Sequence, residues 1–261
     1  METKLNYKRT FLIGLAFLSI CSFWQMYDNI IPLILQNTYH LGETMTGAVM
    51  ALDNVLAIFL LPVFGALSDK VHTKLGRRMP FIVAGTILAV IFMMLLPMID
   101  NAEKARWNTG ESFSNQVIFL AVLFFTLVSM GLYRSPAVAL MPDVTPNHLR
   151  SRANAVINLM GAVGGVYALI MIKVLVGKGE TPDYLPLFAS IAAVMAIAVG
   201  ILVITIRENK LREEVEKAEA ANAGTIEEKA MAEGVEAAGE IEAVGDTGEI
   251  KSFDGKKQTG K

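Results

Sequence analysis

The sequence predicts an all-α membrane protein with six transmembrane helices and an acidic cytoplasmic tail. Two observations support this prediction. First, 53% of the 261 residues are hydrophobic and the mean hydropathy is +0.47, which is too apolar for an ordinary soluble domain. Second, the apolar residues gather in blocks of about 20, the length that a helix needs to cross roughly 30 Å of hydrocarbon. Each block must be helical, because lipid offers the backbone no other hydrogen-bonding partner.

The predicted spans follow one another along the first 206 residues, which we expect to form one membrane domain (1–206). They cover 11–35, 45–67, 79–99, 116–141, 153–176 and 185–206. The first block is longer than the apolar segment of a signal peptide, and no small-residue cleavage site follows it. We therefore interpret it as a permanent first span.

The charges of the connecting segments predict the orientation. Lys and Arg are concentrated before the first span and in alternate connections, at 70–78, 148–152 and 207–212. The other connections have few basic residues or balance them with acids. Cytoplasmic loops carry the excess of Lys and Arg, so we expect both termini to be cytoplasmic in a multi-pass protein of the plasma membrane.

The last 55 residues differ in composition from the membrane domain. Residues 207–261 carry 14 acidic side chains against 9 basic ones, whereas residues 1–206 carry 11 against 14. The stretch 207–221 is predicted to be a charged helical extension, with Glu and Lys at helical spacing. The stretch 222–261 is rich in Ala, Gly and Glu with one aromatic residue, and is predicted to be disordered.

Polar side chains within the spans are the candidate site residues. They are costly in lipid, so by default they line a cavity or meet a partner. From a rise of about 1.5 Å per residue, we expect an outer polar layer and an inner one along an aqueous path. The outer layer comprises Gln25, Asp28, Asn29, Asp53 and Asn54, and the inner one Arg134 and Asn158, with Asn154 as a further candidate.

Two interpretations of these acids stay open. Two neighbouring carboxylates in a low dielectric are easier to protonate, which suits a site that carries a proton or closes around a sodium ion. Alternatively, each acid caps a helix or lies among the lipid headgroups. The fifth span adds a packing signal, because Asn154 and Asn158 share a face with Gly161 and Gly165. This Gly-x-x-x-Gly spacing lets another helix approach closely, with asparagines that can hydrogen-bond across the contact.

Several classes of function are disfavoured. The only cysteine, Cys21, lies in an apolar block, so we expect no disulfide and no cysteine metal site. The sequence contains no His-Glu-x-x-His, no Gly-x-Ser-x-Gly and no phosphate-binding loop, and its three histidines all fall in predicted loops. We therefore predict no enzyme, no metal, no cofactor and no nucleic-acid partner.

The stretch "GALSDKVHTKLGRRMP", residues 65–80, resembles a family motif. It is similar to the cytoplasmic 2–3 loop motif of the major facilitator superfamily, Gly-x-x-x-Asp-Arg/Lys-x-Gly-Arg-Arg/Lys, with "VHTKL" lengthening the segment between Lys70 and Gly76. The lengthened loop resembles the glycoside–pentoside–hexuronide:cation symporters and the sucrose/proton symporters. The segments "WQMYDNIIPLILQ" and "YRSPAVALMPDVTPNHLRSRANAVINLMGAVGG" support the same placement.

The resemblance implies a fold and a mechanism. The six helices would be one half-bundle of a transporter in which two halves rock around a midplane site. Asp69 would pair with the motif arginines and meet a helix N-terminus of the second half, which closes the cytoplasmic side. The implied cytoplasmic gate and charge network comprises Gly65, Asp69, Lys70, Gly76, Arg77, Arg78, Asp143, Arg150 and Arg152.

The resemblance also implies a function and partners. We expect secondary active symport of a sugar or glycoside with H⁺ or Na⁺, in contact with membrane lipid and with a second six-helix half, from a separate chain or a missing segment. The sucrose symporters carry a stretch similar to Pro-x-Arg-Ala-Leu-x-x-Asp, which reads "PAVALMPD" here with Val138 in place of the arginine. Arg134 is the candidate to replace it. The alternative is a non-transporting membrane regulator or assembly subunit that acts through the tail.

Overall fold

A computed structural model describes residues 5–71, 73–107, 115–177, 182–217 and 219–220. Its described residues form six long helices, each long and apolar enough to cross a membrane, which confirms the predicted fold class. They are α1 (Tyr7–Asn37), α2 (Glu43–Lys70), α3 (Met79–Trp107), α4 (Gln116–Asp143), α5 (Arg150–Leu175) and α6 (Leu185–Thr205), with a short 3₁₀ helix, η1 (Asn147–Leu149), before α5.

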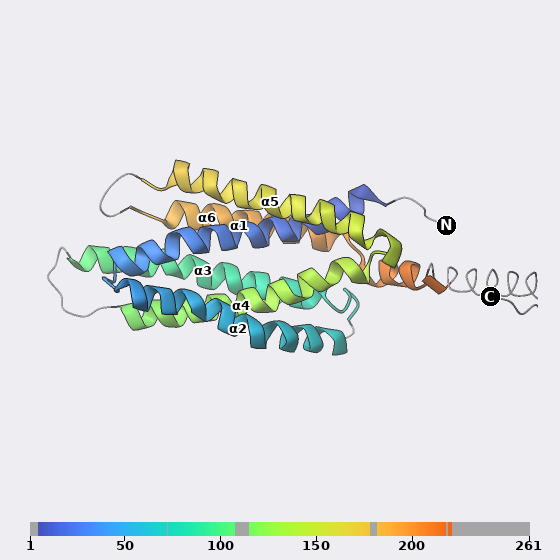
Figure 1. Ribbon diagram of the computed structural model, residues 1–261, viewed down its shortest axis with the longest axis horizontal. Coiled ribbons are helices and arrows are strands. Elements are labelled where there is room, and N and C mark those ends of the chain that lie inside the picture. Colours follow the sequence, from blue (N-terminus) through green and yellow to red (C-terminus); the bar gives the residue numbers. More distant parts are fainter. Residues whose placement is uncertain (1–4, 72, 108–114, 178–181, 218, 221–261) are drawn as a thin grey trace, which may run out of the picture. The chain divides into compact units, whose positions relative to one another are not determined.

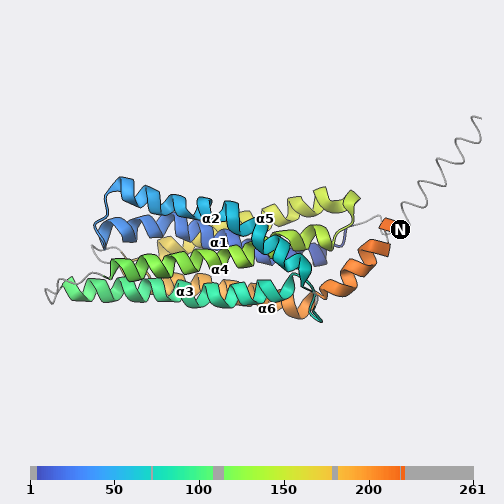
Figure 2. The same cartoon turned by 90° about the horizontal axis from the view of Figure 1, so that it is seen from below.

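The helices pack in an antiparallel bundle (Figures 1 and 2). Helix α1 lies along α5, α3 lies along α4, α2 packs on α4, and α6 lies against both α1 and α3. Large side chains fill the core, and the largest of those that are almost completely buried are the aromatic residues Phe23, Tyr27, Phe119, Tyr133 and Phe188. Figure 2 shows α2 and α5 along one side of the bundle and α3 and α6 along the opposite side.

The side that carries α2 and α5 exposes apolar side chains. Only Thr46 and Ser68 are buried along α2. Exposed large apolar residues on these two helices include Val55, Ile58, Phe59, Val63, Leu159, Val163, Val166 and Leu169. An apolar surface of this extent is stable only in contact with lipid or with another protein.

Helix α3 continues past the predicted end of its span at residue 99. Its polar extension, through Trp107, stays helical because Ala, Glu, Lys and Arg are good helix formers. Lys104 also pairs with Asp100 one turn earlier, at 2.6 Å between Nζ and Oδ2. The sequence placed these residues in a loop because hydropathy marks where a helix leaves lipid, whereas the helix itself ends further on.

The chain divides into two compact units, Met1–Val215 and Glu216–Lys261. After α6, residues 208–217 are helical, as are 219–220, within the range where we predicted a charged helical extension. Leu211 and Val215 from this segment are buried in the first unit. The predicted disordered segment, 222–261, lies outside the described residues.

Candidate functional site

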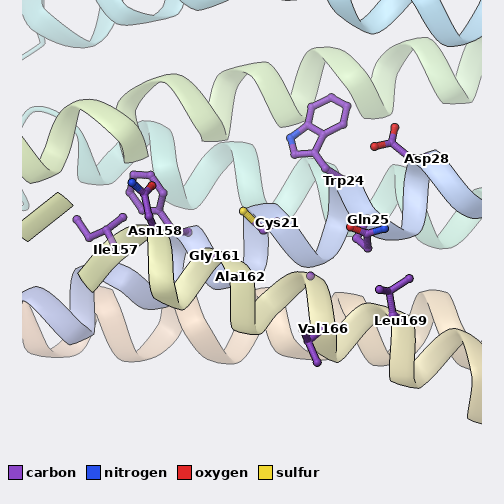
Figure 3. Close-up of a pocket in the computed structure, with 12 residues that line it drawn as sticks. Cys21, Trp24, Gln25, Asp28, Ile157, Asn158, Gly161, Ala162, Val166 and Leu169 are labelled. Carbon is purple, nitrogen blue, oxygen red and sulfur yellow. The ribbon is translucent and has the colours of Figure 1, made fainter. Parts of the chain in front are cut away.

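A cavity of about 420 Å³ lies between α1 and α5 (Figure 3). Its polar lining comes from three of the predicted site residues, Gln25 and Asp28 on α1 and Asn158 on α5, together with the thiol of Cys21. Its remaining lining residues are Phe17, Trp24, Ile157, Gly161, Ala162, Gly165, Val166 and Leu169. In Figure 3, Trp24 and Asp28 project from the same side of α1. The cavity therefore combines an apolar wall with a few polar groups, as ligand sites generally do.

The walls of this cavity are held by close contact between α1 and α5. A Cβ atom added to Gly164 would collide with the carbonyl oxygen of Leu18, and one added to Gly161 would lie 2.9 Å from the Cys21 sulfur. Ser22 donates a hydrogen bond to the Gly164 carbonyl across the contact, at 2.9 Å. The predicted close approach at the glycines of the fifth span is therefore present. Gly164, which we had not named, is the closest point, and Gly165 lines the cavity instead.

A second, smaller cavity of about 20 Å³ lies between α1, α2 and α4. Asp53 and Arg134 line it together with Trp24, and its other lining residues are Leu56, Ala57, Leu60, Leu61, Leu127 and Gly131. The Arg134 guanidinium stands over the Trp24 ring, with Cζ 5.5 Å from the centroid. Asp53 accepts a hydrogen bond from the side chain of Asn54 at 3.0 Å.

The structure changes the predicted layers in two ways. We expected Arg134 in an inner layer, yet it lines the same cavity as Asp53. A helical side chain points back towards the N-terminus of its helix, which is the predicted outer end of α4, so the guanidinium of an arginine lies closer to that end than its own Cα does. Asn29 belongs to neither cavity lining, because its amide donates to the Gln25 carbonyl of its own helix at 2.6 Å.

An ionic network joins the C-terminal ends of α2 and α4 and the N-terminal end of α3, the side predicted to be cytoplasmic. The Arg78 guanidinium lies 2.6 Å from Asp69 and 3.0 Å from Asp143. Arg77 lies 3.1 Å from Asp143 and 3.8 Å from Asp69. Arg78 also donates to the Ser68 hydroxyl at 2.5 Å and to the Gly65 carbonyl at 3.2 Å. The side chain of Arg78 is only 7% exposed, whereas that of Asp69 is 48% exposed, so one edge of the network is open.

Three residues of the implied network have other surroundings. Arg150 donates to the carbonyls of Thr145 and Pro142, at 3.2 and 2.9 Å, and so caps the end of α4. The side chains of Arg152 and Lys70 are exposed. The ionic contacts with Asp69 and Asp143 that the structure describes come from Arg77 and Arg78.

Glu208, which was not predicted from the sequence, binds the backbone of the two arginines that form this network. Its carboxylate is 1% exposed and accepts hydrogen bonds from the backbone N–H groups of Arg77, Arg78 and Met79, at 2.8 to 3.1 Å. These N–H groups form the start of α3, where a negative charge is favourable. Gly76 has a φ of +126°, and a Cβ on it would collide with the Glu208 side chain. In the sequence, Glu208 was one of many acids in a charged stretch, without a spacing that marked it.

Polar contacts also join the helices at the opposite end of the bundle, which is predicted to face outwards. Asp100, fully buried, accepts from Thr38 at 2.7 Å and pairs with Lys104. Lys104 donates to the Pro182 carbonyl at 2.6 Å and lies 4.5 Å from the centre of the Tyr184 ring. Burial raises the pKa of the Tyr184 hydroxyl, and the charge of Asp100 raises it further. Burial likewise raises the pKa of Tyr39, with Asp100 and Glu103 adding to the effect. Among the described residues, no three His, Cys, Asp or Glu side chains gather as metal ligands.

Comparisons with known proteins identify relatives and a family for the chain. The chain is 26% identical to sucrose transport protein SUT3 of Oryza sativa subsp. japonica over 137 residues, which cover 49% of this chain and 27% of that protein. It is 35% identical to sucrose transport protein SUC4 of Arabidopsis thaliana over 116 residues, which cover 42% and 22%. The aligned parts thus span about a quarter of the length of these curated relatives. The sequence profile of the Major Facilitator Superfamily matches residues 7–243, most of the chain, and the protein is therefore a member of the major facilitator superfamily.

Proposed function

We propose that the chain forms one half of a secondary active symporter that moves a sugar or glycoside together with a proton by alternating access. The observation that carries the proposal is the cavity between α1 and α5, which is lined by the amides of Gln25 and Asn158 and by the carboxylate of Asp28. Membership in the superfamily and similarity to proteins named as sucrose transport proteins support the same substrate class.

The cavity suits a hydroxylated solute. Its volume of about 420 Å³ lies within the range of small-molecule sites. Gln25 and Asn158 each offer a donor and an acceptor, and Asp28 offers two acceptor oxygens, which match the alternating donors and acceptors of sugar hydroxyls. The surrounding Phe17, Ile157 and Leu169 can pack against the apolar faces of a sugar ring.

The smaller cavity favours a proton over a sodium ion. A volume of about 20 Å³ is enough for roughly one water molecule. Asp53 is its only carboxylate among the described residues, and the remaining lining is apolar except for Trp24 and Arg134. A sodium ion would need several oxygen ligands and would be repelled by the guanidinium. A proton on Asp53 needs neither, so we assign the coupling role to this carboxylate.

The cytoplasmic network supports the alternating-access part of the proposal. Arg77 and Arg78 hold Asp69 at the end of α2, and the exposed edge of Asp69 is free to meet a helix N-terminus of a second half. The exposed apolar side of α2 and α5 is the surface on which we place that half, whether another chain or a further segment supplies it. The remaining apolar surface would face lipid.

The test is transport by the full chain in proteoliposomes, reconstituted alone and together with a candidate second half. We expect an inward proton gradient to drive accumulation of radiolabelled sucrose. Asp53→Asn should abolish accumulation of sucrose against its own concentration gradient, because the amide binds no coupling proton. The exchange of sucrose across the membrane should be unaffected. Asn54→Ala serves as the matched control, since it alters the neighbouring residue without removing the carboxylate.

Three results would contradict the proposal. Uptake that persists after collapse of both the proton and the sodium gradients would exclude symport. If a sodium gradient drives accumulation at constant pH, the coupling ion is sodium rather than a proton. If no sugar is transported with any partner half, the chain does not perform this function.

A further inference from the structure

The side of the bundle that carries α2 and α5, here called the α2/α5 face, exposes polar groups at membrane depth (Figure 2). Asn54 of α2 and Asn154 and Asn158 of α5 are exposed within the predicted spans. Polar side chains are costly against lipid, and amides in membranes generally bond across helix contacts. The mixture of amides with a large apolar surface therefore suits a protein partner better than lipid.

The two helices that border this face carry opposite charges at each end. Helix α2 has Glu43 in its first turn and Asp69 in its last, whereas α5 has Arg152 in its first turn and Lys173 in its last. All four side chains are exposed. Within the part of the chain that the structure describes, Glu43, Arg152 and Lys173 form no ion pair. Acids thus mark both ends of α2 and bases both ends of α5, with Lys70 as the one base that ends α2.

The spacing of these charges is similar on the two helices. Glu43 and Asp69 are 26 residues apart, and Arg152 and Lys173 are 21 residues apart. At a rise of about 1.5 Å per residue, the two separations are about 39 and about 32 Å. The long, flexible side chains of arginine and lysine can span the small difference at each end. Helices α2 and α5 also run in opposite directions, so the last turn of α2 and the first turn of α5 lie at the same end of the bundle (Figure 1).

These relations make the α2/α5 face complementary to itself. A two-fold axis parallel to the helices would place α2 of one copy along α5 of a second copy, and α5 along α2, with their ends level. Asp69 would then face Arg152 of the second copy at one end, and Glu43 would face Lys173 of that copy at the other. The symmetry repeats each pair, so four contacts between opposite charges would surround the apolar centre of the face.

We propose that the partner of the α2/α5 face is a second copy of this chain, bound as a parallel two-fold dimer. The second copy also completes the cavity between α1 and α5, because the lining residues Asp28, Asn158, Val166 and Leu169 are exposed in a single copy. The inference rests on the proposed function for what the dimer does, whereas its formation depends on this face alone.

Cross-linking between two differently tagged copies tests the arrangement. In a Cys21→Ser background, one copy carries Leu67→Cys, three residues from the end of α2, and the other carries Ala155→Cys, five residues from the start of α5. Both positions are exposed. We expect a short bismaleimide to link the two tags in membranes that contain both copies. The matched control is Ala84→Cys on α3 with Ile201→Cys on α6, which are exposed and similarly close to the same end, on helices of the opposite side. Absence of the first cross-link, or equal linking of both pairs, would overturn the proposal.

Charge reversal tests the self-complementarity. Glu43→Lys and Lys173→Glu, each alone, should raise the dissociation constant of the dimer about tenfold, because two ion pairs are replaced by two like-charge contacts. The double variant should restore the original value, since each new acid meets a new base of the other copy. Energy transfer between differently labelled copies, measured in liposomes over a range of protein-to-lipid ratios, gives these constants. Lys210→Glu, at an exposed position after α6, is the control for the change in net charge. Single reversals that act no more strongly than this control would contradict the inference.

Failure of the proposed function gives a different result. A dimer that forms as described but transports no sugar supports the inference and refutes the function. Sugar transport by vesicles that each hold one copy, or transport that requires a different six-helix chain while no dimer forms, keeps the function and overturns the inference.

Discussion

At the scale of single residues, Glu208 shows how one buried carboxylate organises the ionic network at the start of α3. It accepts hydrogen bonds from three successive backbone N–H groups at the start of α3, so it satisfies donors that a helix leaves unpaired. The same carboxylate requires glycine at position 76, where φ is positive and a Cβ has no room. Glu208 thereby fixes the backbone from which Arg77 and Arg78 reach Asp69 and Asp143.

We predict that Glu208→Gln lowers the free energy of unfolding by about 1–3 kcal/mol, because charge-assisted hydrogen bonds to buried N–H groups are replaced by weaker neutral ones. Denaturant unfolding of the full chain in mixed micelles measures this. Glu214→Gln is the control on the same helical segment. Its side chain is 61% exposed and pairs with Arg9 at 3.3 Å, an exposed ion pair that should contribute little. Equal effects of the two variants would refute the role of Glu208.

At the scale of elements, the contact between α1 and α5 forms the larger cavity. Two glycines let the helices approach at Gly161 and Gly164, while Ser22 donates across the gap. The close approach brings Gln25 and Asn158 to the same cavity from residues far apart in sequence. The helix spacing, rather than any single polar residue, therefore determines whether a site exists.

We predict that Gly164→Ala destabilises the protein by about 1–3 kcal/mol, because the added methyl group forces the helices apart. Unfolding in mixed micelles measures the loss. Gly200→Ala on α6 is the matched control, since a Cβ there meets nothing within 4 Å. This control should be neutral or slightly stabilising, by up to about 1 kcal/mol, because alanine favours the helix. A tolerated Gly164→Ala would show that the two helices are not in close contact.

At the scale of the whole molecule, the arrangement of charge predicts the orientation in the membrane. The N-terminal end of α1 and the C-terminal end of α2, which precedes the basic cluster, lie at one end of the bundle, and the C-terminal end of α5 and the N-terminal end of α6 lie at the other. The bundle has no membrane reference of its own, so its orientation is still a prediction from the positive-inside rule.

We predict that Lys74 is cytoplasmic and Gly177 is on the opposite side. In a Cys21→Ser background, intact cells expressing Gly177→Cys should react with a membrane-impermeant maleimide, because that loop faces outwards. Cells expressing Lys74→Cys should react only after permeabilisation. Both positions are exposed, so reactivity reports the side of the membrane rather than burial. The reverse labelling pattern would invert the topology.

Much of the candidate site could be predicted from the sequence, because polar side chains are energetically costly in lipid and are therefore rare within the spans. Gln25, Asp28, Asp53, Arg134 and Asn158 were all identified on this basis, and all of them line a cavity. Which cavity each one lines could not be predicted, because depth along a helix does not specify the direction of a side chain. Asn29 and Asn54 were identified on the same basis, but neither lines these cavities. Their side-chain amides donate hydrogen bonds to neighbours in their own helices.

The sequence by itself determined the number of spans and the residues of the 2–3 loop motif, because hydropathy and charge are local properties that water and lipid act on directly. Only the tertiary structure decided that Trp24 lines two cavities, that Arg134 and Asp53 line the same one, and that Glu208 caps α3. Each of these relations joins residues on different helices. Such relations depend on how the helices rotate and pack against one another, which no local pattern encodes.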